Sequence, residues 1–194
     1  MPHSNIYQLI LSRRTIRRFQ QKEIPGETLS ELVQAARLAP SGSNLQPLTS
    51  IIVNRKELLP EVFFTTRWAG YITPKGTPSP EERPTAYIVV LINRNIRAAG
   101  GYHDSGAAMM SMILAAWEKG IGSCWIGSVE REQLAALLAI PAHFEIDCVL
   151  ALGYPAEQPV VEDYSGSVEY WKDETGVLHV PKRKLKDILH WNGF

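Results

Sequence analysis

The sequence contains only two cysteines, Cys124 and Cys148, in 194 residues. They form no CxxC pair and no disulfide framework, so we expect a protein of a reducing compartment, the cytoplasm. The chain does not open with a charged leader followed by an apolar stretch, and it has no run approaching 18 apolar residues. We therefore expect neither a signal peptide nor a membrane-spanning helix.

The sequence also lacks an excess of either charge, because 20 basic residues balance 20 acidic ones. Nucleic-acid and membrane-surface binders usually carry a broad basic excess, so we expect neither partner. No GxGxxG or GxxxxGK[ST] motif opens a predicted helix, which disfavours a dinucleotide or P-loop fold. The histidines match no metal-ligand spacing, and we expect no metal site.

Within this neutral chain, four arginines fall in the six residues from Arg13 to Arg18, and no acidic residue precedes Glu23. If the segment is extended, Arg13, Thr15 and Arg17 share one face. Two guanidinium groups and a hydroxyl on one face suit a phosphate monoester. A solvated basic face and an arginine-rich nucleic-acid module are the alternatives.

Helices and strands mix without strict alternation, which predicts one α+β domain over residues 1–194. Residues 60–84 hold five of the 13 prolines, and we expect an irregular covering segment or lid there. We expect the helix after His103 to be buried on nearly every side, with Asp104 as its cap and Gly120 ending it. Helices are predicted at 4–12, 28–39 (with a Thr28–Glu31 capping box), 104–119, 130–138 and up to 190; strands at 49–54, 86–93 and 146–152; and a hairpin turn at 173–176.

Four separated segments resemble the FMN-dependent nitroreductase family, and together they run nearly end to end. They are Ser12–Phe19; Ala36–Pro47; Asp104–Ala108 with Gly120–Gly127; and Leu152–Pro155 with the basic Lys182–Lys184. The resemblance implies a central, mostly antiparallel β-sheet surrounded by helices. It also implies a homodimer with FMN at the subunit interface and a C-terminal extension packing on the partner.

The resemblance assigns the basic residues to the FMN phosphate. The residues so implied are Arg13, Arg14, Thr15, Arg17, Lys182 and Lys184. The side chain of Arg14 should face away from the other three N-terminal residues. We expect Arg18 to form a surface or interface ion pair.

Two further segments are implied to contact the flavin. A loop reaching over from the other subunit contributes Pro40, Ser41, Gly42, Asn44 and Gln46, although its polar residues alone fit a plain helix-to-strand connection equally. A segment along the isoalloxazine contributes Cys124, Trp125, Ile126 and Gly127, with the backbone N–H of Ile126 or Gly127 donating to flavin N5. Trp125 fits a core tryptophan equally well, and Cys124 lacks the basic partner that a catalytic thiol needs.

The implied reaction passes a hydride from NADH or NADPH through FMN to an organic acceptor such as a nitroaromatic, quinone or enone. We expect no catalytic side chain, because positioning supplies much of the barrier reduction. Phe63, Trp68 and Tyr71 are predicted to bind the acceptor, with dimer-interface core as the alternative. The alternative functions are a reductive dehalogenase, a flavin-fragmenting enzyme and a non-catalytic FMN storage or sensor protein.

Overall fold

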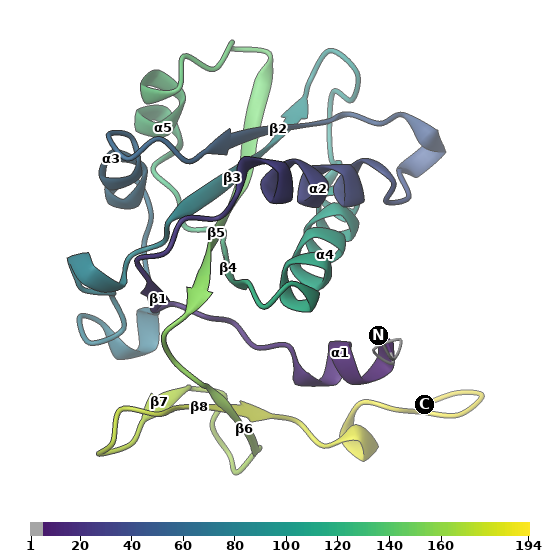
Figure 1. The fold of residues 1–194 in the computed structure, drawn as a ribbon. Coiled ribbons are helices and arrows are strands. Elements are labelled where there is room, and N and C mark those ends of the chain that lie inside the picture. The colour runs from purple at the N-terminus through teal and green to yellow at the C-terminus, as the bar shows by residue number, and fades with distance from the viewer. Residues whose placement is uncertain (1–5) are drawn as a thin grey trace.

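The computed structural model describes residues 6–194 and shows a central antiparallel sheet flanked by helices (Figure 1). The sheet order is β1-β5-β3-β2, and β4 pairs with β5 beside β1. The strands are β1 Phe19–Gln20, β2 Leu48–Val53, β3 Ala86–Asn93, β4 Gly122–Ile126 and β5 Phe144–Pro155. The predicted α+β class and antiparallel sheet are confirmed.

Two pairs of helices cover the two faces of this sheet (Figure 1). Side chains of α2 and α4 pack on one face, and those of α3 and α5 pack on the other. The helices are α1 Ile6–Ser12, α2 Gly26–Arg37, α3 Leu59–Phe64, α4 Tyr102–Glu118 and α5 Arg131–Leu137. Single 3₁₀ turns occur at Gly42–Asn44, Gly70–Ile72, Pro80–Glu82 and Leu185–Asp187.

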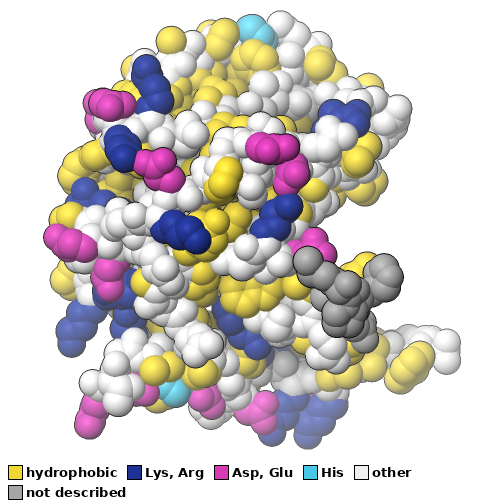
Figure 2. All heavy atoms as spheres, viewed as in Figure 1, with side chains coloured by type: hydrophobic (Ala, Val, Ile, Leu, Met, Phe, Trp, Pro, Cys, Tyr) yellow, Lys and Arg dark blue, Asp and Glu magenta, His cyan; other side chains and the backbone are white. Residues whose placement is uncertain are grey.

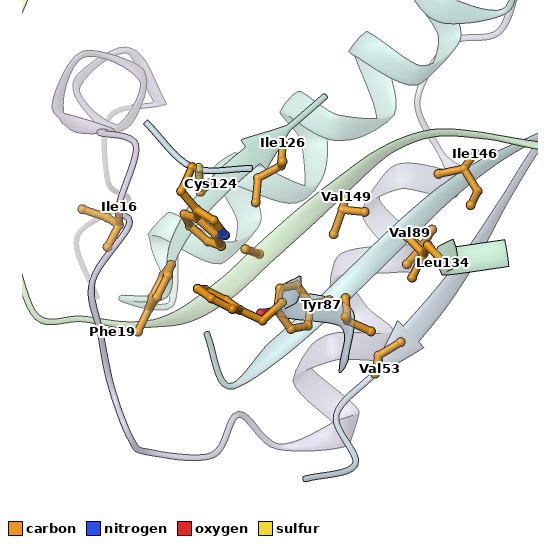
Figure 3. Packing of buried hydrophobic residues seen from close by; sticks show 14 of the residues in the cluster. Ile16, Phe19, Val53, Tyr87, Val89, Cys124, Ile126, Leu134, Ile146 and Val149 are labelled. Carbon is orange, nitrogen blue, oxygen red and sulfur yellow. The ribbon is translucent and has the colours of Figure 1, made fainter. Parts of the chain in front are cut away.

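Strand β3 separates the two hydrophobic clusters because successive side chains of a strand point to opposite faces. Ile88 and Val90 face α2 and α4. Tyr87 and Val89 face the α3–α5 side, which also contains Ile16 and Phe19 from the N-terminal segment (Figure 3). This burial on both faces explains why β3 is almost continuously apolar, and its predicted bounds are confirmed.

The N-terminal segment crosses the sheet over two glycines that are paired across β4 and β5, Gly122 and Gly153. A Cβ on Gly122 would lie 2.7 Å from Ile16, and one on Gly153 would lie 2.7 Å from Phe19. The backbone therefore approaches so closely that a side chain has no room. This contact fixes where residues 13–19 lie against β4.

A second, smaller sheet follows β5 and lies below the main body in Figure 1. Its order is β6-β8-β7, with β7 and β8 antiparallel around the turn predicted at 173–176, so that hairpin is confirmed. The strands are β6 Val160–Asp163, β7 Trp171–Lys172 and β8 Leu178–Lys182.

Four local predictions about helices were wrong. The helix predicted up to residue 190 is only the 3₁₀ turn at Leu185–Asp187. The helix α2 begins at Gly26 after Pro25, so Thr28 lies inside it and caps nothing. Residues 59–64 are helical, whereas an irregular segment was predicted. The helix α4 buries one side only, and Met110 stays 37% exposed in the single chain. The first two residues predicted for the opening helix, 4 and 5, lie outside the described residues.

No helix among residues 6–194 is long and apolar enough to cross a membrane. The same residues contain no cluster of three His, Cys, Asp or Glu side chains able to hold a metal ion.

Candidate functional site

The N-terminal arginines lie in an extended segment beside β4. Thr15 pairs with Ser123 in parallel, and the Ile16 N–H donates to the Ser123 carbonyl at 2.9 Å. Ile16 is 1% exposed, whereas its neighbours Thr15 and Arg17 are partly exposed. The alternation assumed from the sequence is followed here, with Thr15 and Arg17 on the outer face.

The charges of Arg13 and Arg17 are unneutralised within residues 6–194, where neither guanidinium forms an ion pair. Burial lowers the pKa of Arg13, and the positive charge of Arg14 lowers it further. The Arg17 guanidinium lies 5.0 Å from the centroid of Tyr170. Glu157 accepts from the backbone N–H groups of Arg17 at 2.6 Å and of Arg18 at 3.2 Å, but it is not an ion-pair partner of the Arg17 guanidinium. Two guanidinium groups without an ion-pair partner are candidates for binding an external anion.

The other two arginines of the segment are already engaged. Arg14 donates from Nη1 to the Leu11 carbonyl at 2.8 Å and to the Arg13 carbonyl. Arg18 forms an ion pair with Glu82, as expected. Two of the four arginines, Arg14 and Arg18, therefore bind other groups of the chain, and the guanidinium groups of Arg13 and Arg17 form the basic surface of the segment.

The outer edge of β4 offers backbone N–H groups beside this basic surface. In an antiparallel pair, successive residues direct their amides alternately toward and away from the partner strand. The Ser123 carbonyl points away from β5, since it accepts from Ile16. The same alternation directs the N–H group of Trp125 to the outer edge and that of Ile126 toward β5. Gly127 follows the last paired residue of β4, and its carbonyl accepts from Arg131.

Arg131 holds the end of β4 against a bulge in β5. Its guanidinium donates to the carbonyls of Ile146 at 2.9 Å, Asp147 at 2.9 Å and Gly127 at 3.2 Å. The bulge occurs because Val90 pairs with Cys148 while Leu91 pairs with Ile146, which leaves Asp147 without a β3 partner. This arrangement could not be predicted from the sequence, because the guanidinium binds only backbone carbonyls, which every residue carries.

Asp104 holds the loop at residues 41–46 in place. Its carboxylate accepts from the Ser41 hydroxyl at 3.0 Å and from the Gly42 N–H at 3.0 Å, and lies 3.5 Å from Arg97. The prediction that Asp104 caps its own helix was wrong, since Gly101 precedes α4 and no side chain caps it. The carboxylate binds another segment instead.

This contact supports a strained loop. Three non-glycine residues, Ser43, Asn44 and Gln46, have φ values of 53°, 54° and 51°. Such left-handed conformations persist only where the surroundings hold them. The Ser41 hydroxyl also accepts from the Gln46 N–H at 3.0 Å, so one carboxylate stabilises both ends of the turn.

Comparison with known proteins assigns this arrangement to a family. A protein-family model described as "Nitroreductase family" matches residues 10–74 and 77–154 of this chain. The chain belongs to the nitroreductase family of oxidoreductases. The matched range includes the arginine segment, the 41–46 loop, α4 and β4, so the predicted family is confirmed.

Several relatives carry related names. A protein of Archaeoglobus fulgidus, provisionally named an NADH dehydrogenase/NAD(P)H nitroreductase, is 32% identical over 158 residues, covering 78% of this chain and 86% of its own. An iodotyrosine deiodinase of Thermotoga neapolitana is 26% identical over 167 residues, covering 77% and 88%. A provisionally named nitroreductase of Desulfovibrio desulfuricans, solved in complex with FMN, has a TM-score of 0.70 and 26% identity, covering 99% of each chain.

In this nitroreductase-family chain, the other residues predicted to bind the cofactor differ in their exposure and in their contacts. Cys124 is buried, and burial raises the pKa of its thiol to about 11, which keeps it neutral. Trp125 is 42% exposed and packs toward Gly106, so it is not a core residue. Lys184 lies 3.8 Å from Asp163, whereas Lys182 is exposed at the end of β8.

The aromatic residues predicted to bind the acceptor also differ in exposure: two are buried and one is exposed. Phe63 and Trp68 are each 5% exposed, and their stacked rings, 5.5 Å apart, belong to the core. The Trp68 indole donates to the Thr66 hydroxyl at 2.9 Å. Burial weighs against stacking of these two rings on an acceptor. Tyr71 is 57% exposed and contacts Tyr170, the ring that Arg17 covers.

Proposed function

We propose that this chain binds FMN along the outer edge of β4 and passes a hydride from NADH or NADPH to an organic acceptor. The observation that carries the proposal is the pair of unneutralised guanidinium groups, Arg13 and Arg17, on the segment paired with that edge. A phosphate monoester matches this pair, and a flat polar ring edge matches the outward amide of Trp125.

The residues have distinct parts in this proposal. Arg13, Thr15 and Arg17 hold the phosphate, supported by Lys182 and Lys184 and, less directly, by Arg14. The Gly127 N–H is kept as the candidate donor to the flavin ring, because the alternation directs the Ile126 N–H toward β5. Cys124 and Trp125 flank this edge.

The chemistry that FMN supplies when bound is hydride exchange between a reduced nicotinamide and an acceptor. The protein binds and orients these groups, and no titrating side chain is required. Cys124 and Cys148 fit this description, since burial raises the pKa of both thiols and keeps them unreactive.

We also propose a homodimer in which Pro40, Ser41, Gly42, Asn44 and Gln46 approach the partner's flavin. The exposed apolar residues of the C-terminal tail support this assembly (Figure 2). Leu185 is 67% exposed, Ile188 57% and Trp191 80%. A tail of this composition needs a covering surface, and the partner subunit supplies one.

The absorption spectrum of the purified protein tests the function directly, before and after anaerobic NADH and then NADPH. We expect flavin bands that bleach with at least one nucleotide. Bands that neither nucleotide bleaches would indicate FMN storage instead. If FMN neither co-purifies nor binds when added, the proposal fails.

A further inference from the structure

A cavity of about 450 Å³ lies where residues 65–67 meet the chain that follows β4. Its wall contains the aromatic residues Phe63, Phe64 and Trp68 and the cationic residues Arg67 and Arg83, and no aspartate or glutamate lines it. By contrast, the cavity of about 950 Å³ beside the β7–β8 hairpin is lined by residues of both charges. The smaller cavity has the volume of a small-molecule site.

Arg83 brings an unpaired charge to this cavity. Its Nε atom is buried without a hydrogen-bond partner, and no carboxylate within residues 6–194 forms an ion pair with it. The guanidinium carbon lies 4.1 Å from the centroid of Phe63 and 5.1 Å from that of Phe64. Arg67 differs, since Glu130 neutralises it at 2.9 Å. Hydrogen bonds from the backbone and Ser79 lower the pKa of the exposed Glu81, and the charge of Arg83 adds to this effect, so a carboxylate lies near Arg83 without forming an ion pair. A partly buried guanidinium without an ion-pair partner is costly, which favours an anion from outside the chain.

Tyr87 adds a second unpartnered group in the same region. Its side chain is fully buried in the cluster with Phe63 and Trp68, and its hydroxyl has no hydrogen-bond partner within the described chain. Burial raises the pKa of this hydroxyl, and the charge of Arg83 opposes that shift. The core next to Arg83 thus holds two polar groups that the chain itself leaves unsatisfied.

We propose that this cavity binds an aromatic carboxylate, with the carboxylate on Arg83 and the ring against Phe64, the aromatic residue of the wall that is 63% exposed. Ser128 lines the cavity and directly follows Gly127, the candidate donor to the flavin ring. The ligand is then an acceptor held next to the proposed flavin ring, so its assignment as an acceptor rests on the proposed function. The binding itself does not depend on that function.

Calorimetric titration of the FMN-supplemented protein with 4-nitrobenzoate and with uncharged 4-nitrobenzamide tests the proposal. We expect the carboxylate to bind at least 10-fold more tightly than the amide, with a preference that weakens as salt is added. Equal affinities for the two compounds would overturn the proposal without any variant.

Variants then locate the charge. Arg83→Met should weaken 4-nitrobenzoate at least 10-fold and leave 4-nitrobenzamide within about twofold, whereas Arg83→Lys should retain part of the preference. Arg55→Met, which changes an exposed arginine outside the cavity, should alter neither affinity. An unchanged preference in Arg83→Met would assign the carboxylate to another site. If Arg83→Met does not fold, Arg83→Lys and the salt dependence of the parent protein decide.

The two proposals fail separately. Bleaching of the flavin by NAD(P)H without a carboxylate preference would keep the oxidoreductase and remove the anionic acceptor site. An Arg83-dependent preference without flavin binding would keep the cavity as a carboxylate site and remove its assignment to an acceptor.

Discussion

The arginine segment at residues 13–18 and the loop at 41–46 are both candidate FMN-binding elements, yet the fold holds them by different means. The arginine segment pairs through its backbone with β4 and anchors Ile16 and Phe19 over two glycines. The loop depends on one carboxylate, that of Asp104, and contains three strained residues. One backbone bridge, two buried side chains and the Glu157 carboxylate, which accepts from the Arg17 and Arg18 N–H groups, hold the first element, whereas a single carboxylate controls the second.

The largest effect on stability is expected from adding a side chain at Gly153, where Phe19, at the end of the arginine segment, packs directly on the backbone. Gly153→Ala places a Cβ 2.7 Å from Phe19, and we expect about 2–3 kcal/mol of destabilisation by overpacking. Urea unfolding measures the change. Gly26→Ala is the matched control, because a Cβ there meets nothing within 4 Å, and it should stay within about 0.5 kcal/mol of the parent. Equal effects in the two variants would show that the close packing at Gly153 is unimportant.

The loop should fail more locally. Asp104→Ala removes the carboxylate that accepts from the Ser41 hydroxyl and the Gly42 N–H, and it leaves Arg97 without this ion-pair partner. We expect about 2 kcal/mol of destabilisation. Amide exchange should rise in residues 41–46 and stay unchanged in residues 13–18. Asp104→Asn, which retains an acceptor oxygen, should restore part of the protection.

A control separates this role from loss of a surface charge. Glu31→Gln breaks an exposed ion pair with Lys119 and should cost about 0–0.5 kcal/mol. If Asp104→Ala left exchange in the loop unchanged, the strained conformation would be supported by other contacts, and the contrast between the two elements would disappear.

This difference also explains what the sequence could predict. The burial of Ile16 between the partly exposed Thr15 and Arg17 follows from strand alternation, which is local, whereas the buried Phe19 departs from it. That these side chains bind a phosphate stays a prediction. The role of Asp104 depends on a residue 63 positions away, so a local rule assigned it to its own helix and was wrong. Strand β3 was predicted because it is apolar throughout, whereas β4, a strand of five residues, was not predicted as a strand and only its motif marked the segment.

The burial of Trp68 was unpredictable for the same reason. An aromatic residue in a proline-rich segment fits a lid and a core equally, and only tertiary contacts with Phe63 and Thr66 decide. The family resemblance supplied the order of the motifs. It did not supply the side-chain contacts that orient them.

The arginine segment can be tested through its charges as well as its packing. Arg13→Met and Arg17→Met should each weaken FMN binding about 10-fold, or ~1.4 kcal/mol, by removing a charge-assisted contact with the phosphate. Fluorescence quenching of added FMN measures the dissociation constant. Riboflavin, which lacks the phosphate, should bind the parent and both variants equally. A loss of riboflavin binding would mean that the arginines support the fold of the site instead.

The smallest effect concerns the C-terminal sheet, where His179 lies between two carboxylates. Its Nδ1 is 2.7 Å from Glu162 and its Nε2 3.2 Å from Asp173, and the ring stacks on Trp171 at 4.1 Å. Hydrogen bonding to Glu162 raises the pKa of His179, against the weaker opposing effect of burial. Since the folded pKa exceeds the unfolded value of about 6.5, the stabilisation is complete below that value and is lost as the pH rises through the folded pKa.

Amide exchange in β7 and β8 should therefore accelerate more between pH 6 and pH 9 than the intrinsic rate predicts, by a small factor because the site is close to solvent. His179→Gln should abolish this excess and leave the 41–46 loop unaffected. Asp173 acts at the opposite end of the scale. The Thr175 hydroxyl and His179 lower its pKa to about 2, so its contribution is lost only as the pH falls from about 4 toward 2. If amide exchange in β7 and β8 of the parent protein followed the intrinsic rate at every pH, the two carboxylates would not favour the charged imidazole.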